Sequence, residues 1–170
     1  MTRSVALLRG INVGKSVRIG MADLRALFEE LGATDVATYL QSGNVVYAGE
    51  VRADAVEDAI EKRWGIRPRV LLLDAPALQR VAAANPLLAI ATDPSRLFTT
   101  FLEAVPASLS RPSPADIAPE VLEIGAHAVY QWIPDGVSRS KVPAAFTRSL
   151  GPTATARNQR TVEALLALLA

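Results

Sequence analysis

The chain has 170 residues, of which 50% are hydrophobic, and its formal net charge at pH 7 is +1. These values predict a globular protein with one ordinary domain or two small ones. The chain has no cysteine, which excludes disulfides, thiol catalysis and thiolate metal sites. Its single histidine removes most other zinc and iron schemes, so we expect no metal site and no cofactor.

Six segments in the first half of the chain alternate between strand and helix patterns. They are a strand over residues 3–9, a helix over 21–31, strands over 36–41 and 45–47, a helix over 56–64 and a strand over 67–73. Gly32 and Gly65 stand where such helices end. The order βαββαβ predicts a ferredoxin-like α/β plait over residues 1–74.

The second half predicts the same order of elements. A linking helix and loop occupy residues 75–95, since the helical pattern stops at Asn85 and Pro86. The later segments are a strand over 97–102, short helical turns within 106–119, strands over 121–124 and 128–133, a helix over 142–150, a strand over 153–156 and a helix over 162–169. We expect an α+β fold of two ferredoxin-like subdomains packed together, the second over residues 96–170 with a C-terminal helix. The two halves share no alignable sequence, so this duplication is inferred from pattern alone.

Four polar peptides lie at the edges of these elements, where folds place binding groups. The first, RGINVGKS at residues 9–16, follows a buried strand and nearly matches a nucleotide-binding P-loop. The P-loop needs four residues between its glycines and a helix that begins at the lysine, and neither condition is met here. An anion-binding turn with Arg9, Asn12 and Lys15, or an ordinary Gly-rich connection, both fit this peptide.

The second peptide, QSGN at residues 41–44, suits a hairpin turn. Gly43 and Asn44 tolerate positive φ, and Ser42 can bond its own backbone, so a structural role explains Gly43. Gln41 could instead use its carboxamide to donate to and accept from a ligand.

The third and fourth peptides precede helices. In DGVSRSK, residues 135–141, either Ser138 or Ser140 could cap the next helix, while Arg139 and Lys141 oppose the helix dipole unless an anion or carboxylate lies nearby. In TATARN, residues 153–158, Asn158 is a good N-cap, and Arg157 would stand at the mouth of an anion site at the last helix. The other interpretations are solvated side chains and a capped helix with a surface arginine.

The remaining ionisable residues predict no site. His127 has no serine, aspartate and glycine arrangement around it that would indicate a catalytic triad. The acidic residues of the two early helices are explained as solvated faces. We therefore name no catalytic residue and favour a binding protein over an enzyme.

Six stretches in order resemble the bacterial domain-of-unknown-function family 1697 over nearly the whole chain. They are LLRGINVG at 7–14, MADLRALFEELG at 21–32, TYLQSGNVVY at 38–47, ANP at 84–86, PDGVSRSK at 134–141 and TATARNQRTV at 153–162. The resemblance implies two α/β-plait subdomains and no established activity. Ten residues of this chain match polar positions of the family: Arg9, Asn12, Gln41, Ser42, Asn44, Ser140, Lys141, Thr155, Arg157 and Asn158.

We expect a cytoplasmic protein that binds an anionic, phosphorylated small molecule in a cleft between the subdomains. We expect no membrane partner, because no apolar stretch reaches the roughly 18 residues of a spanning helix. The predicted ligand-binding set is the ten matching residues together with Lys15. One alternative is a nucleic-acid-binding protein, which the near-neutral charge and the few aromatic residues do not favour. Another is an enzyme acting on a phosphate or acyl ester, which would need a base that we cannot identify. A third is a dimerising module with an exposed apolar patch.

Overall fold

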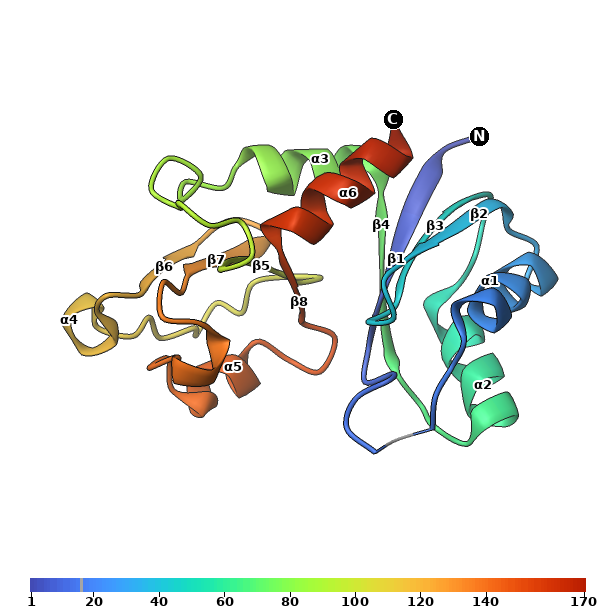
Figure 1. Ribbon diagram of the computed structural model, residues 1–170, viewed down its shortest axis with the longest axis horizontal. Helices are drawn as coiled ribbons and strands as arrows, with labels where there is room; N and C mark the ends of the chain where they lie inside the picture. The colour runs from blue at the N-terminus through green and yellow to red at the C-terminus, as the bar shows by residue number, and fades with distance from the viewer. Residues whose placement is uncertain (16) are drawn as a thin grey trace. The chain divides into compact units, whose positions relative to one another are not determined.

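The computed structural model describes residues 1–15 and 17–170 (Figure 1). Ser16, a member of the first polar peptide, lies outside the described residues. The fold is mixed α+β, with two four-stranded antiparallel sheets that each carry helices. The chain divides into a first unit, Met1–Gln79 with Ala164–Ala170, and a second unit, Arg80–Glu163.

The first unit is a ferredoxin-like plait, as predicted. Its elements are β1 (Arg3–Arg9), α1 (Met21–Glu30), β2 (Thr34–Tyr39), β3 (Asn44–Ala48), α2 (Ala53–Trp64) and β4 (Arg69–Asp74). The strand order is β2-β3-β1-β4, and every neighbouring pair is antiparallel. Such an order requires the two crossovers that α1 and α2 supply.

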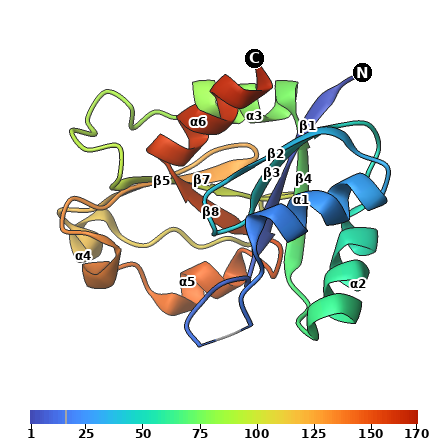
Figure 2. The same cartoon turned by 45° about the vertical axis from the view of Figure 1, so that its right-hand side comes forward.

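Helices α1 and α2 cover one face of this sheet (Figure 2). Alternation along β1 sends Ala6 and Leu8 toward the helices, where both are fully buried among apolar residues of α1 and α2. The ring centroids of Phe28 and Tyr47 lie 5.5 Å apart in this core. Gly65 closes α2 in the left-handed conformation, as the sequence predicts for a helix end.

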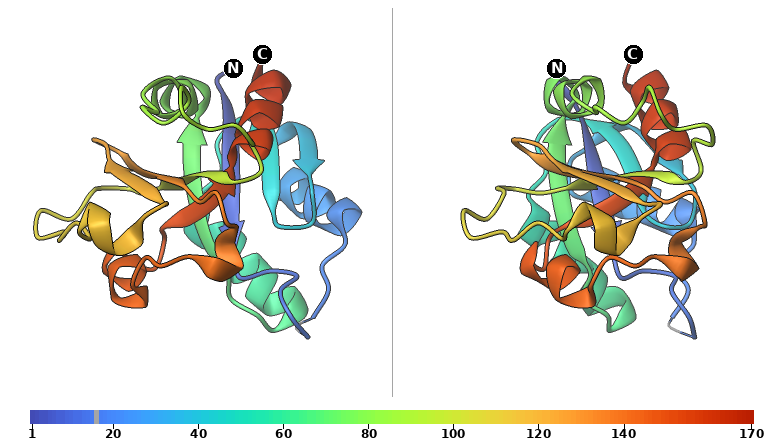
Figure 3. Two further views of the ribbon diagram at one scale, coloured as in Figure 1. Left: turned by 60° about the vertical axis from the view of Figure 1, so that its left-hand side comes forward. Right: turned by 90° about the vertical axis from the view of Figure 1, so that its left-hand side faces the viewer.

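The second unit repeats the plait with shorter helices. Its elements are β5 (Leu97–Phe101), α4 (Pro114–Ile117), β6 (Val121–Ile124), β7 (Ala128–Trp132), a 3-10 turn η1 (Val137–Arg139), α5 (Ala144–Ser149) and β8 (Thr155–Asn158). The strand order β6-β7-β5-β8 is the counterpart of that in the first unit. Helices α4 and α5 lie on one side of this sheet (Figure 3). Two further helices, α3 (Ala75–Ala83) and α6 (Gln159–Leu169), each run across the division between the units.

Several element boundaries differ from the predictions by one to three residues, and two of them have a clear physical cause. The helix expected over residues 142–150 begins only at Ala144, because Pro143 disfavours the α conformation in the residue before it. The last strand covers Thr155–Asn158 instead of residues 153–156, and it is fixed by pairing of Phe101 with Thr155 and of Phe98 with Asn158. Pairing with a distant strand set this boundary, and local propensity could not indicate it.

Candidate functional site

The loop between β1 and α1 is held in place by apolar anchors and one amide. Ile11 and Ile19 are both 2% exposed and pack into the first unit's core. Between them, the Asn12 carboxamide donates to the Ile19 carbonyl oxygen at 3.0 Å and accepts from the Ile19 N–H at 2.7 Å. The ends of the loop are therefore joined.

The backbone of this loop alternates in handedness. Gly10, Asn12 and Gly14 have φ angles of 92°, 53° and 58°, while Ile11 and Val13 between them do not have positive φ. Where left-handed residues alternate with right-handed α residues, successive peptide N–H groups turn to one side and can form a concave cradle for an anion. The Arg18 guanidinium donates to the carbonyl oxygens of Asn12 at 2.7 Å and Gly14 at 3.3 Å. Arg18 therefore binds two carbonyl groups of the loop, and no sequence pattern indicates this role. Because α1 begins only at Met21, the structure has no P-loop helix at Lys15, as the glycine spacing predicted.

The second polar peptide meets this loop at the β2–β3 turn. The Asn12 carboxamide also donates to the carbonyl oxygen of Gln41 at 2.9 Å. Gly43 has a φ of 94°, and a Cβ there would lie 2.8 Å from Leu8 Cβ, which confirms its structural role. Asn44 is fully buried and donates to the carbonyl oxygen of Tyr39 and to Ser42 Oγ, so it fixes the turn. The Gln41 side chain is exposed and is available to a ligand.

Cationic residues gather at the same end of the first sheet. Arg9 and Arg69 are Cα partners in the last described pair of the β1–β4 ladder, and both are exposed. Like charges that face each other across strands are destabilising, and an anion between them would relieve the repulsion. Lys15 is exposed in the adjoining loop. Arg69 could not be identified from the sequence, because nothing local indicates that it pairs with Arg9.

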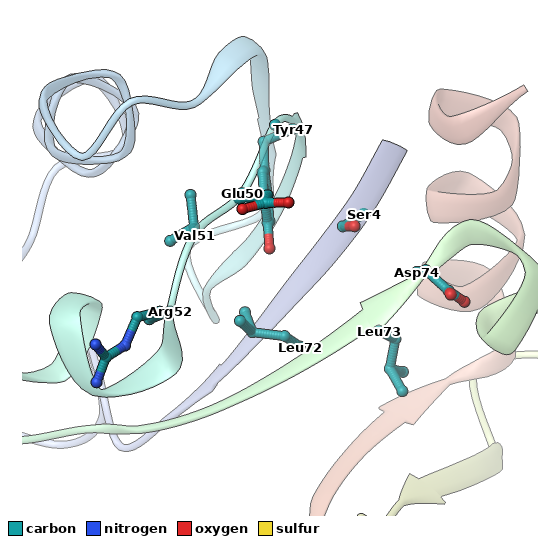
Figure 4. Close-up of a pocket in the computed structure, with 9 residues that line it drawn as sticks. Ser4, Tyr47, Glu50, Val51, Arg52, Leu72, Leu73 and Asp74 are labelled. Carbon is teal, nitrogen blue, oxygen red and sulfur yellow. The ribbon is translucent and has the colours of Figure 1, made fainter. Parts of the chain in front are cut away.

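The opposite end of the same sheet carries a cavity of about 520 Å³ with a different charge (Figure 4). Its lining comes from β1, β3, β4 and the loop before α2, and its charged residues are Glu50, Arg52 and Asp74. The Arg52 guanidinium is bound to the Asp54 carboxylate, which leaves the cavity acidic. Burial raises the pKa of the Tyr47 phenol at its inner wall, although a hydrogen bond with Ser4 acts in the opposite sense. This cavity therefore does not suit an anionic ligand.

In the second unit, Glu120 organises the third polar peptide. Its buried carboxylate accepts a hydrogen bond from the Ser140 hydroxyl at 2.8 Å and another from the Lys141 backbone N–H. The Lys141 ammonium donates to the carbonyl oxygen of Ala118 at 2.5 Å. Ser140 does not cap α5, whose N-cap is Pro143 without a side-chain hydrogen bond. The cap prediction for this peptide was therefore wrong. Glu120 instead binds the Ser140 hydroxyl and the Lys141 backbone, whereas the Lys141 ammonium is bound to a carbonyl oxygen.

The fourth peptide divides between the two faces of β8. Asn158 accepts from the Thr161 backbone N–H at 3.0 Å, which confirms it as the N-cap of α6. Thr155 and Arg157 lie on the sheet face opposite α5, and both are buried. Thr155 donates to the carbonyl oxygen of Thr153, and burial lowers the pKa of the Arg157 guanidinium to about 10. Arg157 is therefore a buried arginine and not a surface one.

The predicted residues fall into two groups, one in each unit. Arg9, Lys15 and Gln41 surround the loop that Asn12 organises, whereas Ser140 and Lys141 are bound to residues 118–120. In the part of the chain that the structure describes, no group of three or more potential metal ligands occurs. Nor does any helix in that part have the length and apolar character needed to cross a membrane.

Comparison with known proteins supports the fold and the family. No curated protein matches the chain. A solved structure of a conserved bacterial protein from Streptococcus pneumoniae is similar with a TM-score of 0.74 and 22% sequence identity, covering 99% of each chain. Residues 1–130 match the family described as protein of unknown function, DUF1697. Since that match extends over most of the chain, this protein belongs to the DUF1697 family.

Proposed function

We propose that the protein binds a phosphorylated or otherwise anionic small molecule at the loop between β1 and α1 of the first unit. The observation that carries this proposal is the alternation of left-handed residues at Gly10, Asn12 and Gly14, directly before Lys15. A cradle of peptide N–H groups beside a lysine provides the hydrogen-bond donors and the charge that a phosphate group requires.

Neighbouring side chains support this proposal. The exposed Gln41 carboxamide is tied to the loop through the hydrogen bond from Asn12 to the Gln41 carbonyl, so it can contact the uncharged part of a ligand held by the loop. Arg9 and Arg69 add positive charge at the same end of the sheet. Because Ile11, Ile19 and Asn12 hold the two ends of the loop without a ligand, the segment around Asn12 would need little ordering on binding.

Calorimetric titration with inorganic phosphate, and then with sugar phosphates and nucleotides, tests the proposal. We expect Lys15→Ala to weaken binding about fivefold, equivalent to about 1 kcal/mol, because one charged donor is lost. Lys62→Ala, which removes an exposed lysine from α2, is the matched control and should leave the affinity unchanged. An equal loss of phosphate affinity in both variants would mean that binding depends on the net charge of the protein and not on the position of Lys15.

A second variant tests the shape of the loop separately from its charge. Gly14→Val places a β-branched residue where φ is 58°, a conformation that such residues strongly disfavour, so it should remove the alternation of the backbone. We expect phosphate binding to be lost while the thermal unfolding transition stays cooperative. Binding that survives Gly14→Val would overturn the cradle.

Measuring the affinity for nucleic acid tests the main alternative, a nucleic-acid-binding protein. A small-molecule site should bind mixed oligonucleotides no better than it binds free phosphate. Tight binding of short RNA or DNA, with an affinity that falls steeply as salt rises, would assign the cationic end of the sheet to a nucleic-acid backbone instead.

A further inference from the structure

The second unit contains a cavity of about 470 Å³ between its sheet and α5, which we name the α5 pocket. Its floor is formed by three adjacent strands, and its wall by η1, α5 and the segment between them. The floor residues are Phe98, Thr100, Gln131, Ile133 and Ala156, and the wall residues are Val137, Ser140, Val142, Ala144, Thr147 and Arg148. All of these residues belong to the second unit, so the cavity is complete within it.

The pocket exists because the helices of the second unit are too short to cover its sheet. In the first unit, α1 and α2 have 10 and 12 residues, whereas α4 and α5 have four and six. At about 1.5 Å per residue, α5 is about 9 Å long, which is roughly half the length of a five-residue strand. Phe146 of α5 and the C-cap residue Leu150 pack into the second unit's core, and the sheet beyond them is left open.

The lining combines an apolar surface with a few polar groups. Most of the lining residues are apolar, including Val137, which is 58% exposed although it is a large hydrophobic residue. The Gln131 carboxamide is half-buried on the floor and has no hydrogen-bond partner among the described residues. Mostly apolar cavities of this size, with a few convergent polar groups, are typical of small-molecule sites.

One positive charge stands at the rim. Arg148 lies in the last turn of α5 and is exposed. Its guanidinium forms no ion pair and no hydrogen bond with any residue that the structure describes. A guanidinium beside an apolar surface can bind an acidic group in bidentate fashion while the rest of the ligand leaves water. No carboxylate is among the residues that line the pocket.

We propose that the α5 pocket binds a small amphipathic acid, with its apolar body on Phe98, Ile133 and the wall of α5 and its acidic group on Arg148. Gln131 then selects among such ligands by pairing with a carbonyl, hydroxyl or amide on the apolar body. This site is separate from the anion-binding loop of the first unit, and its ligand differs in requiring an apolar body.

Two fluorescent dyes that share an apolar aromatic body test the proposal. Anilinonaphthalene sulfonate carries an acidic group, and N-phenylnaphthylamine is its uncharged counterpart. We expect Arg148→Ala to weaken binding of the sulfonate about fivefold and to leave binding of the uncharged dye unchanged. Arg80→Ala, which removes an exposed arginine of α3 from the same unit, is the matched control and should affect neither dye.

Filling the pocket should weaken both dyes. Ala156→Phe places a ring on the floor, and Ala144→Phe places one on the wall. Both alanines are exposed, so whichever variant keeps a cooperative unfolding transition serves the test. We expect each folded variant to bind both dyes about tenfold more weakly than the parent protein. Unchanged dye affinity in a filled variant, or equal weakening of the two dyes by Arg148→Ala, would overturn the proposal.

The chemical class of the acid is resolved by displacement of the bound sulfonate dye. Phenylbutyrate and phenyl phosphate carry different acidic groups on similar apolar bodies, and phenylbutanol carries none. We expect one or both acids, but not the alcohol, to displace the dye from the parent protein. If the alcohol displaces the dye at the same concentration as the acids, Arg148 does not recognise an acidic group and this part of the proposal is wrong.

Discussion

The carboxamide nitrogen of Asn12 lies 2.9 Å from the carbonyl oxygen of Gln41, and this hydrogen bond joins the β1–α1 loop to the β2–β3 turn across 29 residues of sequence. The same carboxamide closes the loop on Ile19. Asn12 therefore positions the candidate anion cradle, and its side chain is occupied within the protein.

Substitution of Asn12 should separate the contribution of its side chain from that of its backbone. Three hydrogen bonds are lost in both Asn12→Gly and Asn12→Ala, at a combined cost of about 2 kcal/mol. Because the φ angle of Asn12 is 53°, alanine should cost about 1 kcal/mol more than glycine. Urea unfolding of the two variants measures both contributions. Equal stability of the two variants would show that the left-handed conformation is not maintained.

Alanine should destabilise the protein much more at Gly43 than at Gly32, a glycine with a similar φ angle. A Cβ at Gly43 would lie 2.8 Å from Leu8 Cβ and 2.9 Å from Ile11 Cδ1, whereas at Gly32, with a φ of 96°, it would meet no atom within 4 Å. Gly32→Ala therefore reports the cost of positive φ alone, about 1 kcal/mol. We expect Gly43→Ala to cost at least about 1 kcal/mol more, because the turn must move away from β1. The midpoints of urea unfolding for the two variants provide the comparison.

Elements that depend on local pattern could be predicted from the sequence. The continuous apolar run of β1 and the apolar spacing of α1 and α2 identified the first plait, and the Asn158 cap of α6 was also found. The partner of Ser140 and Lys141 could not be found in this way, because Glu120 lies about 20 residues earlier and reaches them only in the folded unit. The α5 pocket was missed for a related reason, since it follows from a sheet that its helices do not cover.

Glu120 should stabilise the segment before α5 more than its hydroxyl partner does. The Glu120 carboxylate is 6% exposed and accepts from both Ser140 and the Lys141 backbone. Glu120→Ala removes both hydrogen bonds and leaves their donors without that acceptor, which should cost about 2–3 kcal/mol. Ser140→Ala removes only one, at about 1 kcal/mol. Thermal unfolding of the two variants checks this order, and a larger loss from Ser140→Ala would contradict the central role of Glu120.

Tyr130 should make stability depend on alkaline pH. Its hydroxyl donates to the carbonyl oxygen of Val81 at 2.7 Å, and burial raises the pKa of the phenol above its ordinary value of 10.0. The folded state therefore keeps the proton after the unfolded chain has begun to release it. By linkage, the stabilisation is fully present below about pH 10 and is lost as pH rises through the folded-state pKa.

The matched variant Tyr130→Phe isolates this effect. It should cost about 1 kcal/mol near neutral pH, because the hydrogen bond to Val81 is lost. Its stability should then fall less steeply than that of the parent between about pH 9 and pH 11. The lowered pKa of Arg157 acts in the opposite sense above about pH 10, but it is common to both proteins and cancels in their difference. Urea unfolding of both proteins across this range decides the matter, and parallel pH profiles would mean that the phenol of Tyr130 titrates alike in the folded and unfolded states.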